Sequence, residues 1–207
     1  MINENKNYIL ANEFTVKEES IPAAIHSWKK LYEGLTGRVL YKHTEKNNLL
    51  ELVLLDKPSS IEAELSSPLR LSYQDLVKPA LLTDWRMQLL GLKNKVITGK
   101  NMLPDTKYLQ WRYIEVPLSV YDDYFQWRRA NIFKYVERFP EINYFMAYHS
   151  ALSTKPGVVF LSGFSGDVDK YMDVFNADEF QKVSTEAKQK YILGGDQGLA
   201  LTLYSQV

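Results

Sequence analysis

The chain has no cysteine among its 207 residues. Without thiols it cannot form disulfides, a thiolate metal site, an iron–sulfur cluster or a cysteine nucleophile. It also lacks an excess of either charge, because 25 Lys and Arg balance 25 Asp and Glu. A net charge of zero creates no field that attracts nucleic acid or an anionic membrane surface. We therefore expect a small-molecule ligand as the partner, with no nucleic acid and no membrane.

Long apolar runs and common catalytic signatures are missing as well. No stretch reaches the roughly 18 to 20 apolar residues of a spanning helix, since Leu49 to Leu55 is interrupted by Glu51. The polar start at Met1 to Lys6 has no signal-peptide pattern, so we expect a cytoplasmic protein. Phosphate-loop, HExxH and GxSxG motifs are absent. The three histidines are scattered, and we predict no metal site.

What the sequence does contain is an internal repeat with a period near 100 residues. Tyr8 to Val16 and Tyr108 to Val116 are both extended runs that precede a helical segment. In the first half the pattern predicts a helix after Ser20, strands at 38–44 and 49–56, a helix at 72–85 and a strand at 95–98. The second half predicts a helix at 119–140, strands at 143–151 and 157–164 around a turn at 153–156, a helix at 167–191 and a strand at 198–204.

Helix ends in the second half carry local signals. Ser119 with Asp122 resembles a capping box, and the helix at 167–191 is expected to break at Asn176 to Asp178.

The order strand, helix, strand, strand, helix, strand therefore occurs twice, which defines an α+β fold of ferredoxin-like βαββαβ units. We predict two tandem repeats, 1–99 and 108–207, joined by a linker at 100–107. A single sheet of this kind leaves one apolar face uncovered, so the two halves are expected to pack together as an intrachain dimeric α+β barrel. We expect the protein to be a monomer whose two repeats form a pseudo-dimer; the alternative is a homodimer of two chains.

This architecture resembles the dimeric α+β barrel superfamily, and within it antibiotic-biosynthesis-monooxygenase-like domains, which include haem-degrading monooxygenases. The local points of contact are Ile9 to Asn12, Asn94 to Thr98 and Tyr171 to Ser184. Haem-degrading members carry an Asn on the first strand, and a Trp and a haem-ligating His on the second helix.

By position, Asn12 matches that Asn, and the first half offers Trp85 without a nearby His. In the second half Val174 and Ser184 stand at the Trp and His positions. The resemblance makes haem the candidate cofactor, although with this incomplete set no cofactor is firmly implied.

Alternation along the first strand places Asn12 as the lone amide on an apolar face, and Arg112 occupies the same place in the second half. Either each half has a cavity in which these residues orient a substrate, or they are ordinary buried polar residues with satisfied partners. His149 is the candidate general base or axial ligand, because partial burial can tune its pKa.

We predict Asn12 and His149 as catalytic residues, and Arg112, Trp85, Phe175 and Tyr148 as substrate-binding residues. The predicted function is a monooxygenase-like reaction on a small aromatic or tetrapyrrole-like molecule. The alternative is a small-ligand-binding or regulatory module of the same fold without catalysis.

Overall fold

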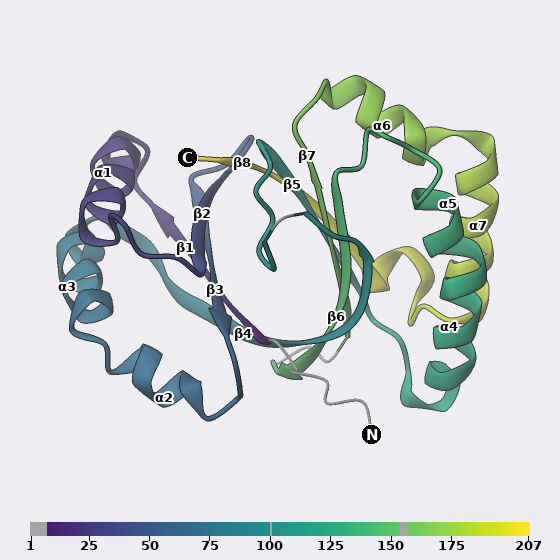
Figure 1. The fold of residues 1–207 in the computed structure, drawn as a ribbon, viewed down its shortest axis with the longest axis horizontal. Helices are drawn as coiled ribbons and strands as arrows, with labels where there is room; N and C mark the ends of the chain where they lie inside the picture. The colour runs from purple at the N-terminus through teal and green to yellow at the C-terminus, as the bar shows by residue number, and fades with distance from the viewer. Residues whose placement is uncertain (1–7, 100, 154–156) are drawn as a thin grey trace.

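The computed structural model describes residues 8–99, 101–153 and 157–207. The polar start and most of the predicted turn at 153–156 lie outside these ranges. Eight strands form one closed barrel in the order β1-β3-β2-β8-β5-β7-β6-β4, and every pair is antiparallel (Figure 1). The strands are β1 (Tyr8–Val16), β2 (Arg38–His43), β3 (Asn48–Leu55), β4 (Leu81–Ile97), β5 (Tyr108–Ile114), β6 (Tyr144–Leu152), β7 (Val158–Phe164) and β8 (Leu199–Gln206).

The barrel consists of two equivalent sheets. The order β4-β1-β3-β2 in the first half is repeated as β8-β5-β7-β6 in the second, and the seams are the pairs β2 with β8 and β4 with β6. The repeat period also holds, because β1 and β5 start at Tyr8 and Tyr108. The predicted fold class, two ferredoxin-like units closed into an intrachain α+β barrel, is therefore confirmed. The predicted domain boundaries remain a prediction.

Helices cover the outside of the barrel on two opposite sides (Figure 1). The first half contributes α1 (Ile21–Leu31), α2 (Ser60–Leu65) and α3 (Pro68–Val77). The second contributes α4 (Tyr121–Arg128), α5 (Lys134–Val136), α6 (Val168–Asn176) and α7 (Asp178–Lys190), with a π-helix at Arg129–Phe133 between α4 and α5.

The predicted helix at 72–85 is wrong in its second part. Helix α3 ends at Val77, and a short 3-10 turn at Lys78–Ala80 leads into β4 at Leu81. Pro79 lies in that turn, and proline cannot donate the backbone hydrogen bond that would continue the helix. Strand β4 is therefore 17 residues long, and the strand predicted at 95–98 is its final part. Trp85 accordingly lies on a strand and not on a helix.

Of the two predictions about helix ends in the second half, one is wrong and one is confirmed. The capping box at Ser119 is wrong, because Leu118–Val120 forms a 3-10 turn and α4 begins at Tyr121 without a side-chain cap. The break near Asn176 is confirmed, since Ala177 has an extended backbone between α6 and α7. Asp167 caps α6 by accepting a hydrogen bond from the backbone N–H of Lys170 at 3.0 Å.

The inside of the barrel is a separate core from the two helix-covered layers. Residues after β4 contribute to it: Leu103 packs among the inward-facing side chains. The hydroxyls of Tyr41 and Tyr144 donate to the carbonyl oxygens of Pro104 and Met102, at 3.0 and 2.9 Å. The connector between the halves thus enters the barrel, as its teal trace in Figure 1 shows, and does not loop freely outside.

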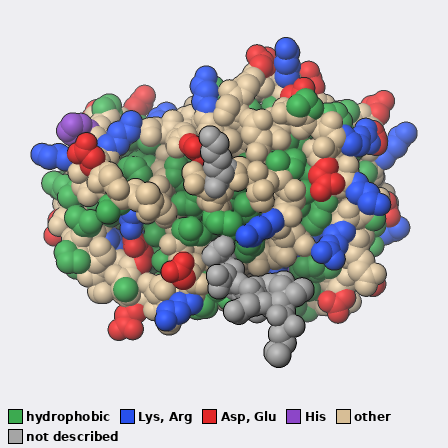
Figure 2. Space-filling model, viewed as in Figure 1, with side chains coloured by type: hydrophobic (Ala, Val, Ile, Leu, Met, Phe, Trp, Pro, Cys, Tyr) green, Lys and Arg blue, Asp and Glu red, His purple; other side chains and the backbone are tan. Residues whose placement is uncertain are grey.

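The molecular surface has no large region of one charge on the face shown in Figure 2, where lysines and arginines alternate with acidic side chains over both halves. No helix in the described part of the chain is long and apolar enough to cross a membrane.

Candidate functional site

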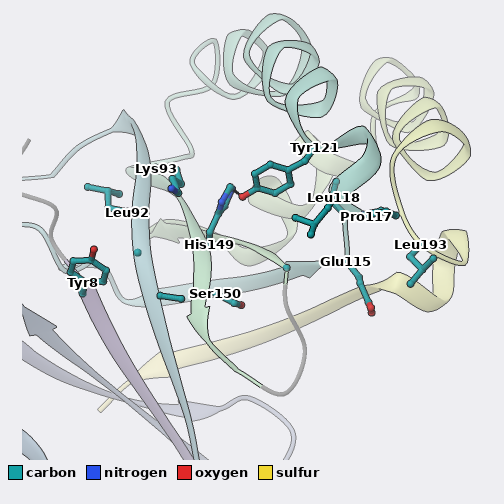
Figure 3. Close-up of a pocket in the computed structure, with 14 residues that line it drawn as sticks. Tyr8, Leu92, Lys93, Glu115, Pro117, Leu118, Tyr121, His149, Ser150 and Leu193 are labelled. Carbon is teal, nitrogen blue, oxygen red and sulfur yellow. Dashed lines mark hydrogen bonds between the residues drawn. The ribbon is translucent and has the colours of Figure 1, made fainter. Parts of the chain in front are cut away.

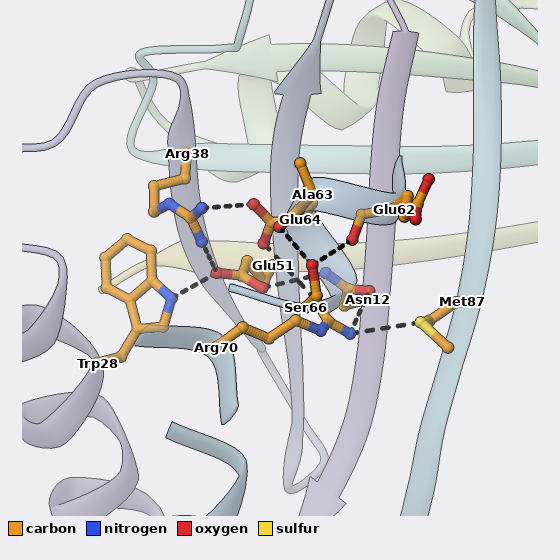
Figure 4. A network of polar contacts seen from close by, with 10 residues as sticks. All are labelled: Asn12, Trp28, Arg38, Glu51, Glu62, Ala63, Glu64, Ser66, Arg70 and Met87. Carbon is orange, nitrogen blue, oxygen red and sulfur yellow. Dashed lines mark hydrogen bonds and ion pairs between the residues drawn. The ribbon is translucent and has the colours of Figure 1, made fainter. Parts of the chain in front are cut away.

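Asn12 lies at the centre of a polar network between the sheet and helices of the first half (Figure 4). Its amide nitrogen donates to Glu51 Oε2 at 3.0 Å, and its oxygen accepts from Arg70 Nη2 at 3.3 Å. The other oxygen of Glu51 accepts from the Trp28 indole at 2.8 Å and from Arg38 Nη1 at 3.0 Å. Asn12 and Glu51 are 0% and 2% exposed, so these bonds replace water for both side chains.

A second carboxylate completes this network. Glu64 accepts a hydrogen bond from Arg38 Nη2 at 2.9 Å and lies 3.8 Å from Arg70 Nη1. Two carboxylates therefore neutralise two guanidinium groups within the protein. The space around Asn12 is occupied by the side chains of this network, in which Glu64 Oε1 and Arg70 Nη1 have no hydrogen-bond partner among the described residues. Asn12 lines neither of the two cavities described below.

The corresponding layer of the second half contains a buried charge that is not neutralised. Arg128, the last residue of α4, is 0% exposed and forms no ion pair with a residue of the described ranges. Its Nη2 donates to Asn94 Oδ1 at 2.6 Å, its guanidinium lies 3.8 Å from the centre of the Phe125 ring, and its Nε has no hydrogen-bond partner. Burial lowers its pKa to about 10. A buried cation of this kind is costly unless an anion compensates it.

His149 on β6 lies directly against Arg128. Its Nε2 is 2.8 Å from the Tyr121 hydroxyl and 3.4 Å from Arg128 Nη1. Because a guanidinium can only donate, Nε2 is the acceptor and the ring proton is on Nδ1. Burial, assisted by the charge of Lys93, lowers the pKa of His149 to about 3. His149 is therefore neutral at ordinary pH, and it is better suited to accept hydrogen bonds than to act as a general base near pH 7.

Tyr121 and His149 form one wall of a cavity of about 440 Å³ (Figure 3). Most of the remaining lining is apolar, with Lys93 as its cationic side chain. Glu115 also lines the cavity, but in Figure 3 its carboxylate points away from His149. The full lining is Tyr8, Gly91, Leu92, Lys93, Glu115, Val116, Pro117, Leu118, Tyr121, His149, Ser150, Ala151, Gly157 and Leu193.

Arg112 lies deeper in the same layer, between β5 and helices α6 and α7. Its guanidinium stacks on Phe175 and Phe180, at 4.7 and 5.3 Å from the ring centres, and donates to Gln110 Oε1 at 3.2 Å. Burial lowers its pKa, and no carboxylate of the described ranges pairs with it. Burial raises the pKa of the nearby Tyr124 hydroxyl, which has no hydrogen-bond partner among the described residues. The helix-covered layer of this half thus holds two guanidinium groups, Arg112 and Arg128, that form no ion pair with a carboxylate of the described ranges.

The structure does not bring all the predicted site residues together. His149, Arg112 and Phe175 lie in the helix-covered layer of the second half. Tyr148 is adjacent to His149 in sequence but faces the barrel interior, where its hydroxyl lies 3.2 Å from that of Tyr144. Trp85 belongs to the first half and packs on Phe14, with ring centres 3.8 Å apart.

The residue that sequence reasoning missed as a site residue is Arg128. Its position was detectable, because Tyr124, Arg128 and Ile132 follow one another at four-residue intervals on the buried face of a predicted helix. A cation on that face needs a partner. Asn94, which lies on β4, could not be connected with it before the seam between β4 and β6 was known.

The sequence matches no protein-family model and no curated protein. Solved structures do match. A protein from Fusobacterium nucleatum subsp. nucleatum, provisionally assigned as a monooxygenase, aligns with a TM-score of 0.75 and 9% identity over 97% of this chain and 92% of that chain. An anthrone oxidase-like protein aligns with a TM-score of 0.73 and 12% identity over 99% and 92%. The heme-degrading enzyme from Listeria monocytogenes aligns with 0.57 and 8% over 96% and 98%.

These likenesses, at low identity, establish the fold alone: the chain shares with these solved structures an α+β barrel, here closed by two ferredoxin-like units of one polypeptide.

Haem does not fit the donors that this chain offers. The structure has no histidine on α3, α6 or α7, and Ser184 on α7 stands at the position where the haem-degrading relatives were expected to carry the ligand. The imidazole of the cavity, His149, already accepts at Nε2 from Tyr121. Among the described residues, no group of three His, Asp or Glu could hold a metal ion.

Proposed function

We propose that the cavity beside Tyr121 and His149, called the helix-side cavity from here on, binds a small aromatic molecule in its anionic form. The protein then promotes monooxygenation of this molecule by dioxygen without haem. The observation that carries this proposal is Arg128, a fully buried cation without a carboxylate, placed directly behind the His149 and Tyr121 wall. The anionic group of a bound ligand would supply the compensating charge.

The residues suggest a division of roles. Lys93 is the cationic donor in the cavity wall that can reach a phenolate or enolate oxygen, while the hydroxyl proton of Tyr121 is donated to His149 Nε2. Arg128 acts through His149, whose acceptor nitrogen it faces at 3.4 Å. The apolar lining at Val116, Pro117 and Leu118 offers a surface on which an aromatic ring can pack.

The π-helix that starts immediately after Arg128 adds support, since such single turns occur frequently at functional sites. It interrupts the regular helix between α4 and α5 at the residue where the buried cation is presented.

No strong base is needed if the substrate is acidic enough to bind as its anion. In the overall reaction, a CH₂ carbon next to aromatic rings becomes a carbonyl with one oxygen atom of dioxygen. The other oxygen leaves as water with the two hydrogens of that carbon. The oxidation of the CH₂ carbon to a carbonyl supplies all four electrons that reduce dioxygen, so the balance requires no separate reductant.

Anthrone, which carries such a carbon and ionises to an aromatic phenolate, is a suitable probe. We expect the wild-type protein to consume one dioxygen per anthrone, saturably and faster than the spontaneous reaction. Lys93→Gln should raise KM about tenfold, the cost of one charge-assisted hydrogen bond. Arg128→Met should also raise KM, because it removes the positive charge behind the His149 wall. Arg129→Gln, which removes an exposed arginine next in the chain, is the control and should be unchanged. Oxygen uptake and product absorbance measure both effects.

The same assay has informative failures. Saturable anthrone binding without oxygen uptake above the spontaneous rate would support the alternative function, a ligand-binding module without catalysis. That alternative is favoured by the pKa of about 3 at His149, which leaves the wall without an efficient base. Stoichiometric haemin binding that is lost in His149→Ala would replace the proposal with haem chemistry.

A further inference from the structure

A second cavity, of about 570 Å³, is lined by side chains of the barrel interior together with exposed residues such as Arg86 and Met87. Its walls include Ala11, Leu50 and Tyr204 of the interior core, together with Trp111 and Tyr113, which pack against that core. Strands β1, β3 and β4 of the first half and β5 and β8 of the second all contribute. The cavity therefore exists only when both halves close into one barrel.

One carboxylate is held in place within this cavity. Glu13 Oε1 accepts hydrogen bonds from the Tyr204 hydroxyl at 2.9 Å and from the Asn48 amide at 3.2 Å. These two donors fix the orientation of the Glu13 side chain. Both hydrogen bonds go to the same oxygen, Oε1. Oε2 accepts no hydrogen bond from a residue of the described ranges. The cavity lining thus combines a carboxylate with the rings of Trp111 and Tyr113, the kinds of group that bind an ammonium group in proteins.

A guanidinium lies opposite this carboxylate on the neighbouring strand. Arg86 on β4 is the register partner of Glu13 on β1, and both side chains line the cavity. Directly opposed residues of an antiparallel pair have Cβ atoms about 5 Å apart, close enough for opposite charges to pair. Nevertheless, Arg86 forms no ion pair or hydrogen bond with any residue in the described ranges. The two charges remain available for a ligand that carries both signs.

We propose that the barrel cavity binds a small zwitterion with an aromatic side group, of the amino-acid type. The ammonium group of the ligand pairs with Glu13, and its carboxylate pairs with Arg86. The aromatic group lies against Trp111 and Tyr113. This site shares no lining residue with the helix-side cavity, and its occupancy is independent of the proposed oxygenation.

Three probes separate the two charges: L-phenylalanine has both groups, 2-phenylethylamine only the ammonium, and 3-phenylpropanoate only the carboxylate. Isothermal titration calorimetry should show one saturable site for L-phenylalanine. Glu13→Gln should weaken L-phenylalanine and 2-phenylethylamine about tenfold or more and leave 3-phenylpropanoate unchanged. Arg86→Gln should show the opposite pattern, weakening the two carboxylates and sparing the amine.

Matched controls remove exposed charges elsewhere. Glu33→Gln and Arg129→Gln lie outside both cavities and should bind all three probes as the wild type does. Because Arg86 is exposed, Arg86→Gln is expected to leave the stability of the fold unchanged. It therefore tests the proposal even if Glu13→Gln lowers the melting temperature.

Three results would overturn the proposal. The first is no saturable binding of any of the three probes. The second is binding that neither Glu13→Gln nor Arg86→Gln weakens. The third is L-phenylalanine binding that Lys93→Gln abolishes, because that loss would assign the ligand to the helix-side cavity. Lys93→Gln also keeps the two proposals apart, since it is expected to impair anthrone oxygenation only.

Discussion

Replacement of Glu51 by alanine is expected to destabilise the protein by about 3 to 5 kcal/mol, the cost of removing one partner from a buried charged network. Glu51 is 2% exposed and accepts hydrogen bonds from Asn12, Trp28 and Arg38. Its loss leaves three donors, one of them charged, without this acceptor in a largely buried layer. Urea-induced unfolding at neutral pH measures the change in the free energy of unfolding.

The surface pair of Arg138 with Glu179 supplies the control for this experiment. Both side chains are more than half exposed, so Glu179→Ala removes an ion pair that water replaces, and little change in stability is expected. Equal effects of the two substitutions, or an effect of Glu51→Ala below about 1 kcal/mol, would show that the network around Asn12 does not hold the first half together.

The stability of the protein is expected to fall with acidification through His149. In the unfolded chain the imidazole takes up a proton below its ordinary pKa of 6.5, while in the folded protein the pKa is about 3. Between these values the unfolded state binds the extra proton, so folding loses about 1.4 kcal/mol per pH unit. The loss from this residue is about 2 kcal/mol at pH 5 and ends near pH 3.

Urea unfolding at pH 7 and pH 5 tests this contribution. His149→Gln has no such proton to take up, so acidification should cost the variant about 2 kcal/mol less than it costs the wild type. His26→Gln, at an exposed position on α1, controls for the loss of a histidine and should follow the wild type. An identical pH dependence of His149→Gln and the wild type would mean that His149 is readily protonated in the folded protein.

The sequence predicted the order of elements because each element has a local signature. Strand alternation from Tyr8 and from Tyr108 gave both first strands with their starting residues. The long strand β4 was missed because its first residues, Leu81 to Trp85, lack a distinctive alternation and follow a helical pattern. What holds them extended is pairing with β1, for instance Thr83 opposite Thr15, which no local pattern reveals.

The candidate site was less predictable for the same reason. Asn12 and Glu51 are cross-strand neighbours, 39 residues apart in the chain, so the partner of the amide follows from strand register alone. Tyr148 and His149 were placed in one site although neighbours on a strand point to opposite faces. Which face is the barrel interior depends on closure, and closure is a property of the whole chain.

Covalent fusion of the two halves has a consequence for how this protein can change. In a homodimer of the same shape, every substitution occurs at both symmetry-related places, so one binding site cannot diverge from the other. Here Asn12 and Arg112 occupy equivalent positions on β1 and β5. Asn12 is an amide inside a network of paired charges, whereas Arg112 is a guanidinium stacked on phenylalanine. A single gene can therefore specialise one half for rigidity and the other for chemistry.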